Sequence, residues 1–441
     1  MNPTAQTDHV LPGGWYTLWA ILIVTVFAFV DRQLLVLAAD PLAKSLHLTY
    51  TDLGLVQGVA FSVFTIVAVY PIAWFADRFD RRYVLSGCVL VWSLGTAACG
   101  LARNFHELFA AAVAMAAGEA GLGPLTMSIV PDLFKGRKRV LANGVQYVAA
   151  YVAISLALAL GGMALSALDH LHPNLPTMLR GWEAWRIAFF AVVLPTPFLL
   201  VAIAFMNLRR SASRSVAGKV VEADADRIWA FLRQHWVAMA TVLGSLGLYL
   251  LAFGGFLVWL PVATARLFGA TPAQNGLGMG SATGVGMFAG VAFSTLLLKR
   301  LMPRMGRIAS VRVAWCVMLV TTPVLLCFPW VMSTWQAYAL MGVMMLSGTA
   351  IGVLVPTMLQ DMTSSAVRAR FLAIYAIAAG LLSGTAPSIV GAVSDAIGGN
   401  RSVLHALSVV ALPAWMGGTV LMMRSERYFT AMSEAAACRE A

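Results

Sequence analysis

Charged residues are scarce in this sequence. Asp, Glu, Lys and Arg make up only 11% of its 441 residues, whereas 60% are hydrophobic and the mean hydropathy is +0.81. A soluble protein carries about 25% charged residues, so most of this surface must face something other than water. The composition excludes an ordinary soluble domain and leaves a polytopic membrane protein.

Cysteine is also scarce, and the common catalytic and metal-binding motifs are missing. The five cysteines show neither CxxC nor zinc-site spacing. The sequence has no HExxH motif, no nucleophile elbow, no cluster of His or Cys ligands and no P-loop. We therefore expect no catalytic residue, metal or cofactor, which argues against a membrane enzyme and against an ATP-driven pump.

Long apolar runs are what the chain has in abundance, and each is long enough to cross a bilayer as a helix. They form two groups of six, at residues 15–39, 53–76, 83–102, 107–130, 141–168 and 186–208, and at 236–265, 275–299, 308–330, 334–359, 370–394 and 402–424. This pattern predicts an all-α membrane protein with twelve transmembrane helices. The predicted parts are an N-terminal bundle (1–208), a cytoplasmic linker with an interfacial helix (209–235), and a C-terminal bundle with a short cytoplasmic tail (236–441).

The positive charge is distributed unevenly along the chain. Lys and Arg exceed Asp and Glu by 11, and most of the 30 basic residues fall in alternate connections between the apolar runs. This asymmetry follows the positive-inside rule and places both termini in the cytoplasm. The charge thus indicates a lipid bilayer as partner and not nucleic acid, and the lack of a recognisable targeting segment favours a bacterial inner membrane.

The two halves repeat weakly in sequence. Gly54 and Gly58 return at one constant offset as Gly276 and Gly280, and the Arg-x-Arg connection after the fourth run returns in the second half. Such glycine pairs fit close helix packing. Parallel six-helix repeats are a transporter architecture, with a substrate site between the halves near the bilayer midplane.

Three charged residues lie well inside apolar runs: Asp31, Arg32 and Glu119. A charge at this depth is costly and marks an ion or substrate pathway by default. Arg32 is a partner for Asp31, but helical neighbours point about 100° apart, so Arg32 can instead meet Glu119 or a substrate anion. The alternative is a structural ion-pair cluster that orients the helices.

The same carboxylates are the predicted route for protons. Removal from water disfavours the charged form of a carboxyl group, which allows it to load and release a proton near neutral pH. The histidines fall in loops or at helix ends. A proton pathway would therefore have to use Asp31 and Glu119.

Charges of both signs are concentrated at the connection between the second and third runs. We expect Asp77 to cap the next helix and to pair with arginines from two other connections, which would close the cytoplasmic side. The alternative is a simple positive-inside anchor. The predicted cytoplasmic gate consists of Asp77, Arg78, Arg81, Arg82, Arg137, Arg139, Arg368 and Arg370.

Several polar and aromatic residues in the spans are candidates for lining a cavity. The alternatives are polar contacts between helices for those of the fifth span and core packing for those of the seventh. The candidates are Gln57, Asn143, Tyr147, Tyr151, Tyr249 and Phe253.

These motifs resemble the major facilitator superfamily over nearly the whole chain. Residues 77–82 are similar to the loop signature after the second helix of that family, although Ala73 and Asp80 stand where it usually has glycine. More narrowly, the chain resembles the spinster-like branch, on the motifs Phe29-Val-Asp31-Arg32, Leu55-Val-Gln57-Gly58, Gly118-Glu119-Ala120-Gly121 and Pro387-x-x-x-Gly391.

This resemblance implies a proton-linked transporter in which Asp31, Arg32 and Glu119 form the coupling and substrate-sensing cluster. Animal members of the branch move lysophospholipids and sphingoid lipids. One departure affects charge: the branch usually has an arginine seven residues before the glutamate, where this chain has Ala112, and Ala116 replaces a usual glycine. Either Arg32 serves both functions here, or the substrate is less anionic.

The sequence as a whole therefore predicts a proton-coupled secondary transporter. It would act as a monomer and move an amphipathic organic anion or lipid-like small molecule by alternating access. The alternatives are an uncoupled facilitator, in which the three charged residues only shape the pocket, and a membrane receptor that binds ligand without transporting it.

Overall fold

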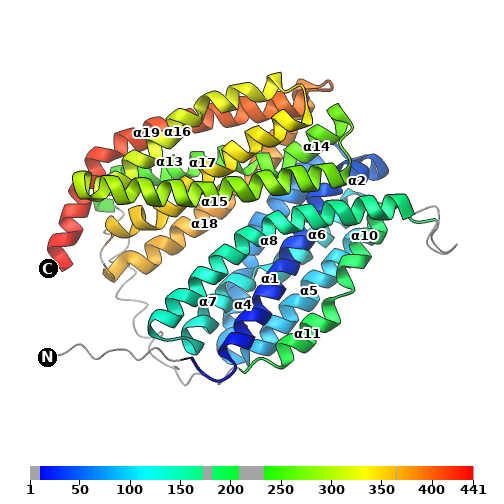
Figure 1. Ribbon diagram of the computed structural model, residues 1–441, viewed down its shortest axis with the longest axis horizontal. Coiled ribbons are helices and arrows are strands. Elements are labelled where there is room, and N and C mark those ends of the chain that lie inside the picture. Colours follow the sequence, from blue (N-terminus) through cyan, green and yellow to red (C-terminus); the bar gives the residue numbers. More distant parts are fainter. Residues whose placement is uncertain (1–9, 172–180, 208–232, 364, 441) are drawn as a thin grey trace. The chain divides into compact units, whose positions relative to one another are not determined.

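The computed structural model describes residues 10–171, 181–207, 233–363 and 365–440, and their regular structure is helical (Figure 1). The linker and interfacial helix predicted at 209–235 lie almost wholly outside these residues. Long helices follow from the apolar runs, because a helix satisfies all its backbone groups internally where no water is available.

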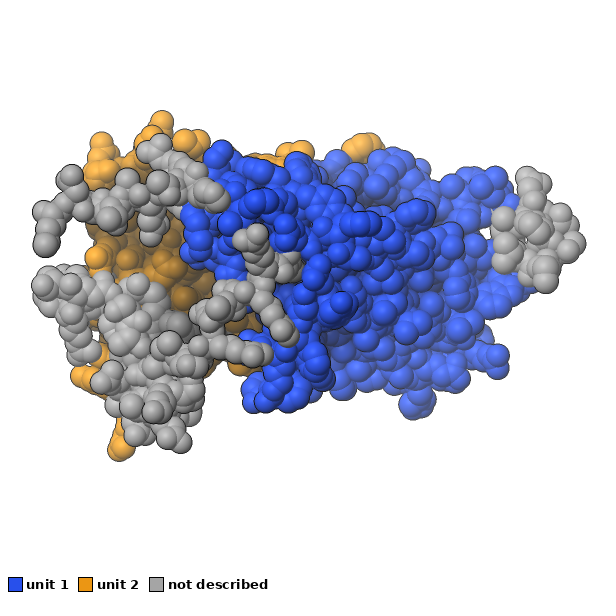
Figure 2. Space-filling model, turned by 90° about the horizontal axis from the view of Figure 1, so that it is seen from below, with its two compact units in different colours: residues 1–212, 269–281 blue, residues 213–268, 282–441 orange. Residues whose placement is uncertain are grey.

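The chain divides into two compact units, coloured separately in Figure 2. The first contains residues 1–212 and 269–281, and the second contains 213–268 and 282–441. The division predicted from sequence assigned residues 269–281 to the second half, whereas their contacts join them to the first.

The first unit is built from the N-terminal helices, with α1 beside α8 and α5 against α6 (Figure 1). The elements are α1 (Gly14–Leu37), α2 (Ala39–Leu46), α3 (Tyr50–Gly54), the π-helical turn η1 (Leu55–Val59), α4 (Ala60–Arg78), α5 (Arg81–Leu101), α6 (Phe105–Glu119), α7 (Leu122–Leu133), α8 (Gly136–Leu171), α10 (Ala184–Val193) and α11 (Thr196–Ala204).

The second unit packs α19 against α13 and α16. Its elements are α13 (Trp236–Gly254), α14 (Phe256–Phe268), α15 (Pro272–Met305, whose first turns belong to the first unit), the short 3₁₀ turns η3 (Gly306–Ile308) and η4 (Phe328–Trp330), α16 (Ala309–Cys327), α17 (Thr334–Asp361), α18 (Ser365–Ile397) and α19 (Ser402–Glu440).

The helices are long and apolar enough to cross a membrane. Within the described ranges, 11 helical stretches meet that requirement, and one of them, Pro272–Trp330, contains both α15 and α16. The stretches thus correspond to the twelve predicted spans, and the predicted fold class is confirmed.

Glycines bring the start of α15 against α8 inside the first unit. A Cβ atom at Gly162 would overlap the carbonyl oxygen of Pro272, and one at Gly276 would overlap that of Leu158. The backbone N–H of Ala273 also donates to the hydroxyl of Ser166 at 2.9 Å. The close packing predicted for Gly276 is therefore present, and it explains why residues 269–281 associate with the first unit.

Candidate functional site

The predicted charged cluster lies in the first unit, where α1, η1, α4, α5 and α6 meet. Asp31 is only 3% exposed, and its Oδ2 atom lies 3.2 Å from the hydroxyl of Thr96 on α5. That hydroxyl is also 3.0 Å from the carbonyl oxygen of Trp92, so its single proton is shared. Oδ1 of Asp31 is buried and has no hydrogen-bond partner in the described part of the chain.

Glu119 is the last residue of α6, at a break in the fourth span. The next helix, α7, begins at Leu122, and Pro124 in its first turn cannot donate a hydrogen bond back to the carbonyl of Ala120. Glu119 lies within electrostatic range of both Asp31 and Arg32. Its Oε1 atom is buried without a hydrogen-bond partner among the described residues.

Arg32 points away from Asp31, as the helical geometry allows. Its side chain is exposed, and its guanidinium carbon lies 4.8 Å from the centre of the Phe61 ring on α4. The Asp31–Arg32 ion pair considered from the sequence is not formed. The exposed guanidinium is therefore accessible to a ligand while it acts electrostatically on Glu119.

Close packing of α5 on α6 positions this cluster. Gly118 lies so near Trp92 that a Cβ atom would overlap the Trp92 backbone nitrogen. The glycine therefore holds Glu119, the next residue, against the helix that carries Thr96. A larger residue at 118 would separate the two helices.

Two buried glutamines add polar atoms to these helices. Gln57 is 6% exposed and lies on the π-helical turn η1, an irregularity that is frequent at functional sites. Gln33 is 3% exposed, and both amide oxygens lack a hydrogen-bond partner in the residues described. Gln33, Thr96 and Phe61 are not among the site residues predicted from the sequence. Gln33, a polar residue two positions after Asp31 in an apolar run, was a detectable signal.

Ala112 occupies the position where the spinster-like branch usually has an arginine, and the surrounding helices leave it no exposed surface. Ala112 on α6 is fully buried, as is Ala116, whose carbonyl oxygen accepts a hydrogen bond from Thr65 at 3.4 Å. The charge balance of the cluster thus depends on Arg32.

The connection between α4 and α5 contains ion pairs within the first unit. Arg81 pairs with Asp132 of α7, and Arg82 lies 2.8 Å from Asp80. Asp80 also accepts a hydrogen bond from the backbone N–H of Arg82 at 2.9 Å and so caps α5. The prediction that Asp77 caps this helix is wrong, because Asp77 lies in the last turn of α4 and Asp80 occupies the capping position.

The remaining residues of the predicted gate are only partly described. Arg78 is exposed and stacks over Trp74, with 3.5 Å between its guanidinium carbon and the ring centre. Arg139 is exposed near the start of α8. The side chains of Arg137, Arg368 and Arg370 lie outside the described residues. Closure of the cytoplasmic side by these arginines stays a prediction.

The candidates for lining a cavity fall into two groups. Tyr249 is 4% exposed, donates a hydrogen bond to the carbonyl of Gly348 at 2.7 Å and stacks on Phe253 with ring centres 5.9 Å apart. This geometry corresponds to core packing inside the second unit. Asn143 and Tyr151 are half-buried on α8, and the side chain of Tyr147 lies outside the described residues.

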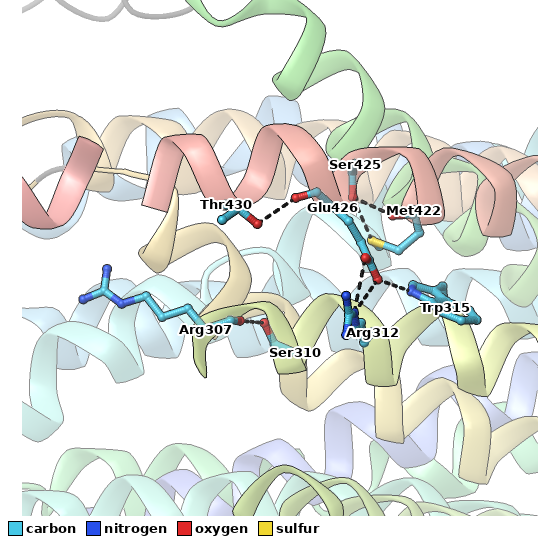
Figure 3. A network of polar contacts seen from close by, with 8 residues as sticks. All are labelled: Arg307, Ser310, Arg312, Trp315, Met422, Ser425, Glu426 and Thr430. Atoms are coloured by element: carbon cyan, nitrogen blue, oxygen red, sulfur yellow. Dashed lines mark hydrogen bonds and ion pairs between the residues drawn. The ribbon is translucent and has the colours of Figure 1, made fainter. Parts of the chain in front are cut away.

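The second unit contains a different carboxylate site, drawn in Figure 3. Glu426 of α19 accepts hydrogen bonds from Nε of Arg312 at 3.1 Å and from the indole nitrogen of Trp315 at 2.7 Å. Both donors come from α16. The carboxylate therefore joins two helices, and its bonding contrasts with that of Asp31 and Glu119.

Comparison with known proteins gives consistent results. The family model described as Major Facilitator Superfamily matches residues 21–387. An MFS-type efflux pump of Mycolicibacterium smegmatis is 26% identical over 333 residues, which cover 74% of this chain and 71% of that protein. Protein spinster homolog 3 of Danio rerio is 25% identical over 198 residues, 39% of each chain.

The fold is similar to that of a solved transporter. The crystal structure of a bacterial homolog of the human lysosomal transporter Spinster, in an inward-facing and unoccupied conformation, superimposes with a TM-score of 0.75. The two chains are 19% identical, and the match covers 97% of this chain and 98% of the other.

Proposed function

The chain belongs to the major facilitator superfamily, and we propose that this integral membrane transporter is a proton-coupled secondary transporter. Its cargo in this proposal is an amphipathic organic anion or a lipid-like small molecule, carried by alternating access. The distribution of basic residues supports a bacterial inner membrane location with both termini in the cytoplasm. The protein would act as a monomer.

One observation carries the proposal: Asp31 and Glu119 each keep a buried oxygen without a hydrogen-bond partner among the described residues. A buried charge is costly unless it is paired. Arg32 can balance one negative charge, whereas two ionised carboxylates carry two. One bound proton would restore the balance, which makes the cluster a proton-loading site.

Competition for Arg32 provides the coupling step. Arg32 is exposed, so a substrate anion can reach the guanidinium that acts on Glu119. When the anion binds Arg32, Glu119 loses its balancing charge and takes up a proton. Anion and proton would then be carried together.

The surroundings of Arg32 support an amphipathic cargo. The Phe61 ring beneath the guanidinium places an apolar face next to the positive charge. A carboxylate, sulfate or phosphate group would bind Arg32 while an attached apolar or aromatic group contacts the ring. The similarity to the spinster proteins is consistent with a lipid-like molecule.

Reconstitution in liposomes that contain a trapped pH-sensitive dye tests the proposal. A panel of lysolipids, fatty acids and aromatic acids should include a compound that induces proton flux in the wild type, and the flux should be lost in Glu119→Gln and in Asp31→Asn. Glu426→Gln is the matched control and should retain it. Transport of an identified compound without proton movement, at the wild-type rate in both variants, would instead establish an uncoupled facilitator.

A further inference from the structure

An apolar cavity of about 470 Å³ lies between α4, α5 and α6 in the first unit, and none of the three residues of the charged cluster lines it. The exposed residues at its mouth are Phe75, Phe79 and Tyr83 together with Pro71 and Val91, whereas Cys88 and Gly118 are buried. The cavity therefore opens at the surface of the protein and ends against the α5–α6 contact.

Small residues create the space. Gly87 has no side chain, and Ala68 and Ala117 have only methyl groups. A Cβ atom added at Gly87 would have no other atom within 4 Å. The cavity is thus an open volume beside α5 that a larger residue at position 87 would fill.

The length of the cavity lining along α4 is comparable to the thickness of one leaflet of a bilayer. This lining extends from Ala68 to Phe79, the residue that ends this helix at the membrane boundary. At 1.5 Å per residue this is about 16 Å, roughly half of the 30 Å hydrocarbon core. With Phe79 at the membrane boundary, a cavity of this length would reach near the midplane.

The lining is suited to a hydrocarbon chain. Apart from the Tyr83 hydroxyl and the Cys88 thiol, the side chains that line it are apolar. Water would find few hydrogen-bond partners there. An empty cavity would lose the dispersion contacts of its walls, whereas a lipid tail supplies them.

A cation is connected to the mouth by a row of aromatic rings. Arg78 stacks on Trp74, Trp74 packs edge-on against Phe75 with ring centres 5.0 Å apart, and Phe75 contacts Phe79 at 5.9 Å. Phe75 and Phe79 line the cavity. Arg81 pairs with Asp132, and Arg82 pairs with Asp80. Arg78 is exposed, next to the exposed Asp77, and is therefore the cation suited to a headgroup phosphate.

We propose that this cavity binds one acyl chain of a bilayer phospholipid whose phosphate group contacts Arg78. The site depends on the protein being embedded in a membrane and not on the identity of its cargo. The bound chain would pack against Gly118, the residue before Glu119, and would thereby support the helix turn that carries the coupling carboxylate.

Photocrosslinking tests the site. The full-length protein would be reconstituted with phosphatidylglycerol that carries a diazirine in its acyl chain, irradiated and analysed by peptide mapping. We expect labelling of residues 68–91, reduced about tenfold in Gly87→Leu, because leucine displaces about two methylene groups of the chain. Gly123→Leu is the matched control: Gly123 also has open space around its Cβ position but does not line the cavity, and labelling should be unchanged.

A second cavity-filling variant, a second lipid probe and an Arg78 variant complete the test. Ala68→Phe fills the same cavity from α4 and replaces Gly87→Leu if that variant does not fold. A diacylglycerol probe, which lacks the phosphate, should label the wild type less than phosphatidylglycerol does, and Arg78→Gln should remove this difference. Equal labelling in the wild type and both filled variants, absence of label from the lining, or displacement of the label by the transported compound but not by excess phospholipid would each overturn the proposal.

Discussion

Glu426 of the second unit and the pair Asp31 and Glu119 of the first unit are bonded in opposite ways. In the second unit, Glu426 accepts hydrogen bonds from Arg312 and Trp315 of one neighbouring helix. In the first unit, Asp31 shares one hydroxyl proton with a competing carbonyl, and Glu119 has a buried oxygen without a partner in the described chain. One carboxylate is saturated and the other two are not.

The difference in hydrogen bonding indicates different roles for these carboxylates. A saturated carboxylate must lose existing bonds before it can bind a proton or a new partner, so Glu426 serves to hold α16 against α19. Asp31 and Glu119 can accept a proton without losing a strong partner. Under the proposed function, we therefore expect Asp31 and Glu119, and not Glu426, to exchange protons.

Removal of Arg32 should have the largest effect. Arg32→Gln is expected to weaken binding of an anionic substrate by about 2 kcal/mol or more, roughly thirtyfold, because the anion loses its charged partner. Equilibrium binding to the purified protein measures this loss. Arg312→Gln removes an arginine from the saturated site and should leave the affinity unchanged; an equal loss in both variants would erase the distinction between the two regions.

Unfolding stability should be affected more by a change at Glu426 than by a change at Glu119. Glu426→Gln weakens bonds to partly exposed Arg312 and to Trp315, so we expect a loss of roughly 1 kcal/mol in unfolding free energy and a lower Tm. Glu119→Gln removes the charge from a carboxylate whose Oε1 atom is buried without a hydrogen-bond partner in the described part of the chain, and it should not lower Tm. Thermal unfolding in one detergent compares them, and a larger drop in Glu119→Gln would assign Glu119 a structural role.

The smallest effect is expected at Thr96. Thr96→Val keeps the shape of the side chain and removes the hydroxyl that bonds Asp31, a change of about 1 kcal/mol or less because the proton is shared with Trp92. Proton flux at saturating substrate should fall less than about fivefold. Thr96→Ser restores the hydroxyl and should restore the flux; failure to do so would place the effect in packing.

The sequence predicted the spans and the charged cluster for simple physical reasons. A bilayer requires apolar runs of fixed minimum length, and a charge inside such a run is conspicuous. Asp31, Arg32 and Glu119 could therefore be identified without a structure. Gln33 carried a similar but weaker signal.

Other features required tertiary structure. The choice between Asp77 and Asp80 as helix cap depends on the residue at which α4 ends, and sequence patterns fix helix ends only to within a few residues. The Arg81–Asp132 pair joins two separate helices, and the association of residues 269–281 with the first unit depends on backbone contact at Gly162 and Gly276. Neither follows from local sequence.

The most direct measurement compares two transport modes of Glu119→Gln in the same liposomes. If Glu119 carries the coupled proton, the variant should exchange labelled substrate across the bilayer without a pH gradient at near the wild-type rate. It should also fail to accumulate substrate when a pH gradient is imposed. Accumulation at the wild-type level in Glu119→Gln would contradict the account, since the unsaturated carboxylate would then have no part in driving transport.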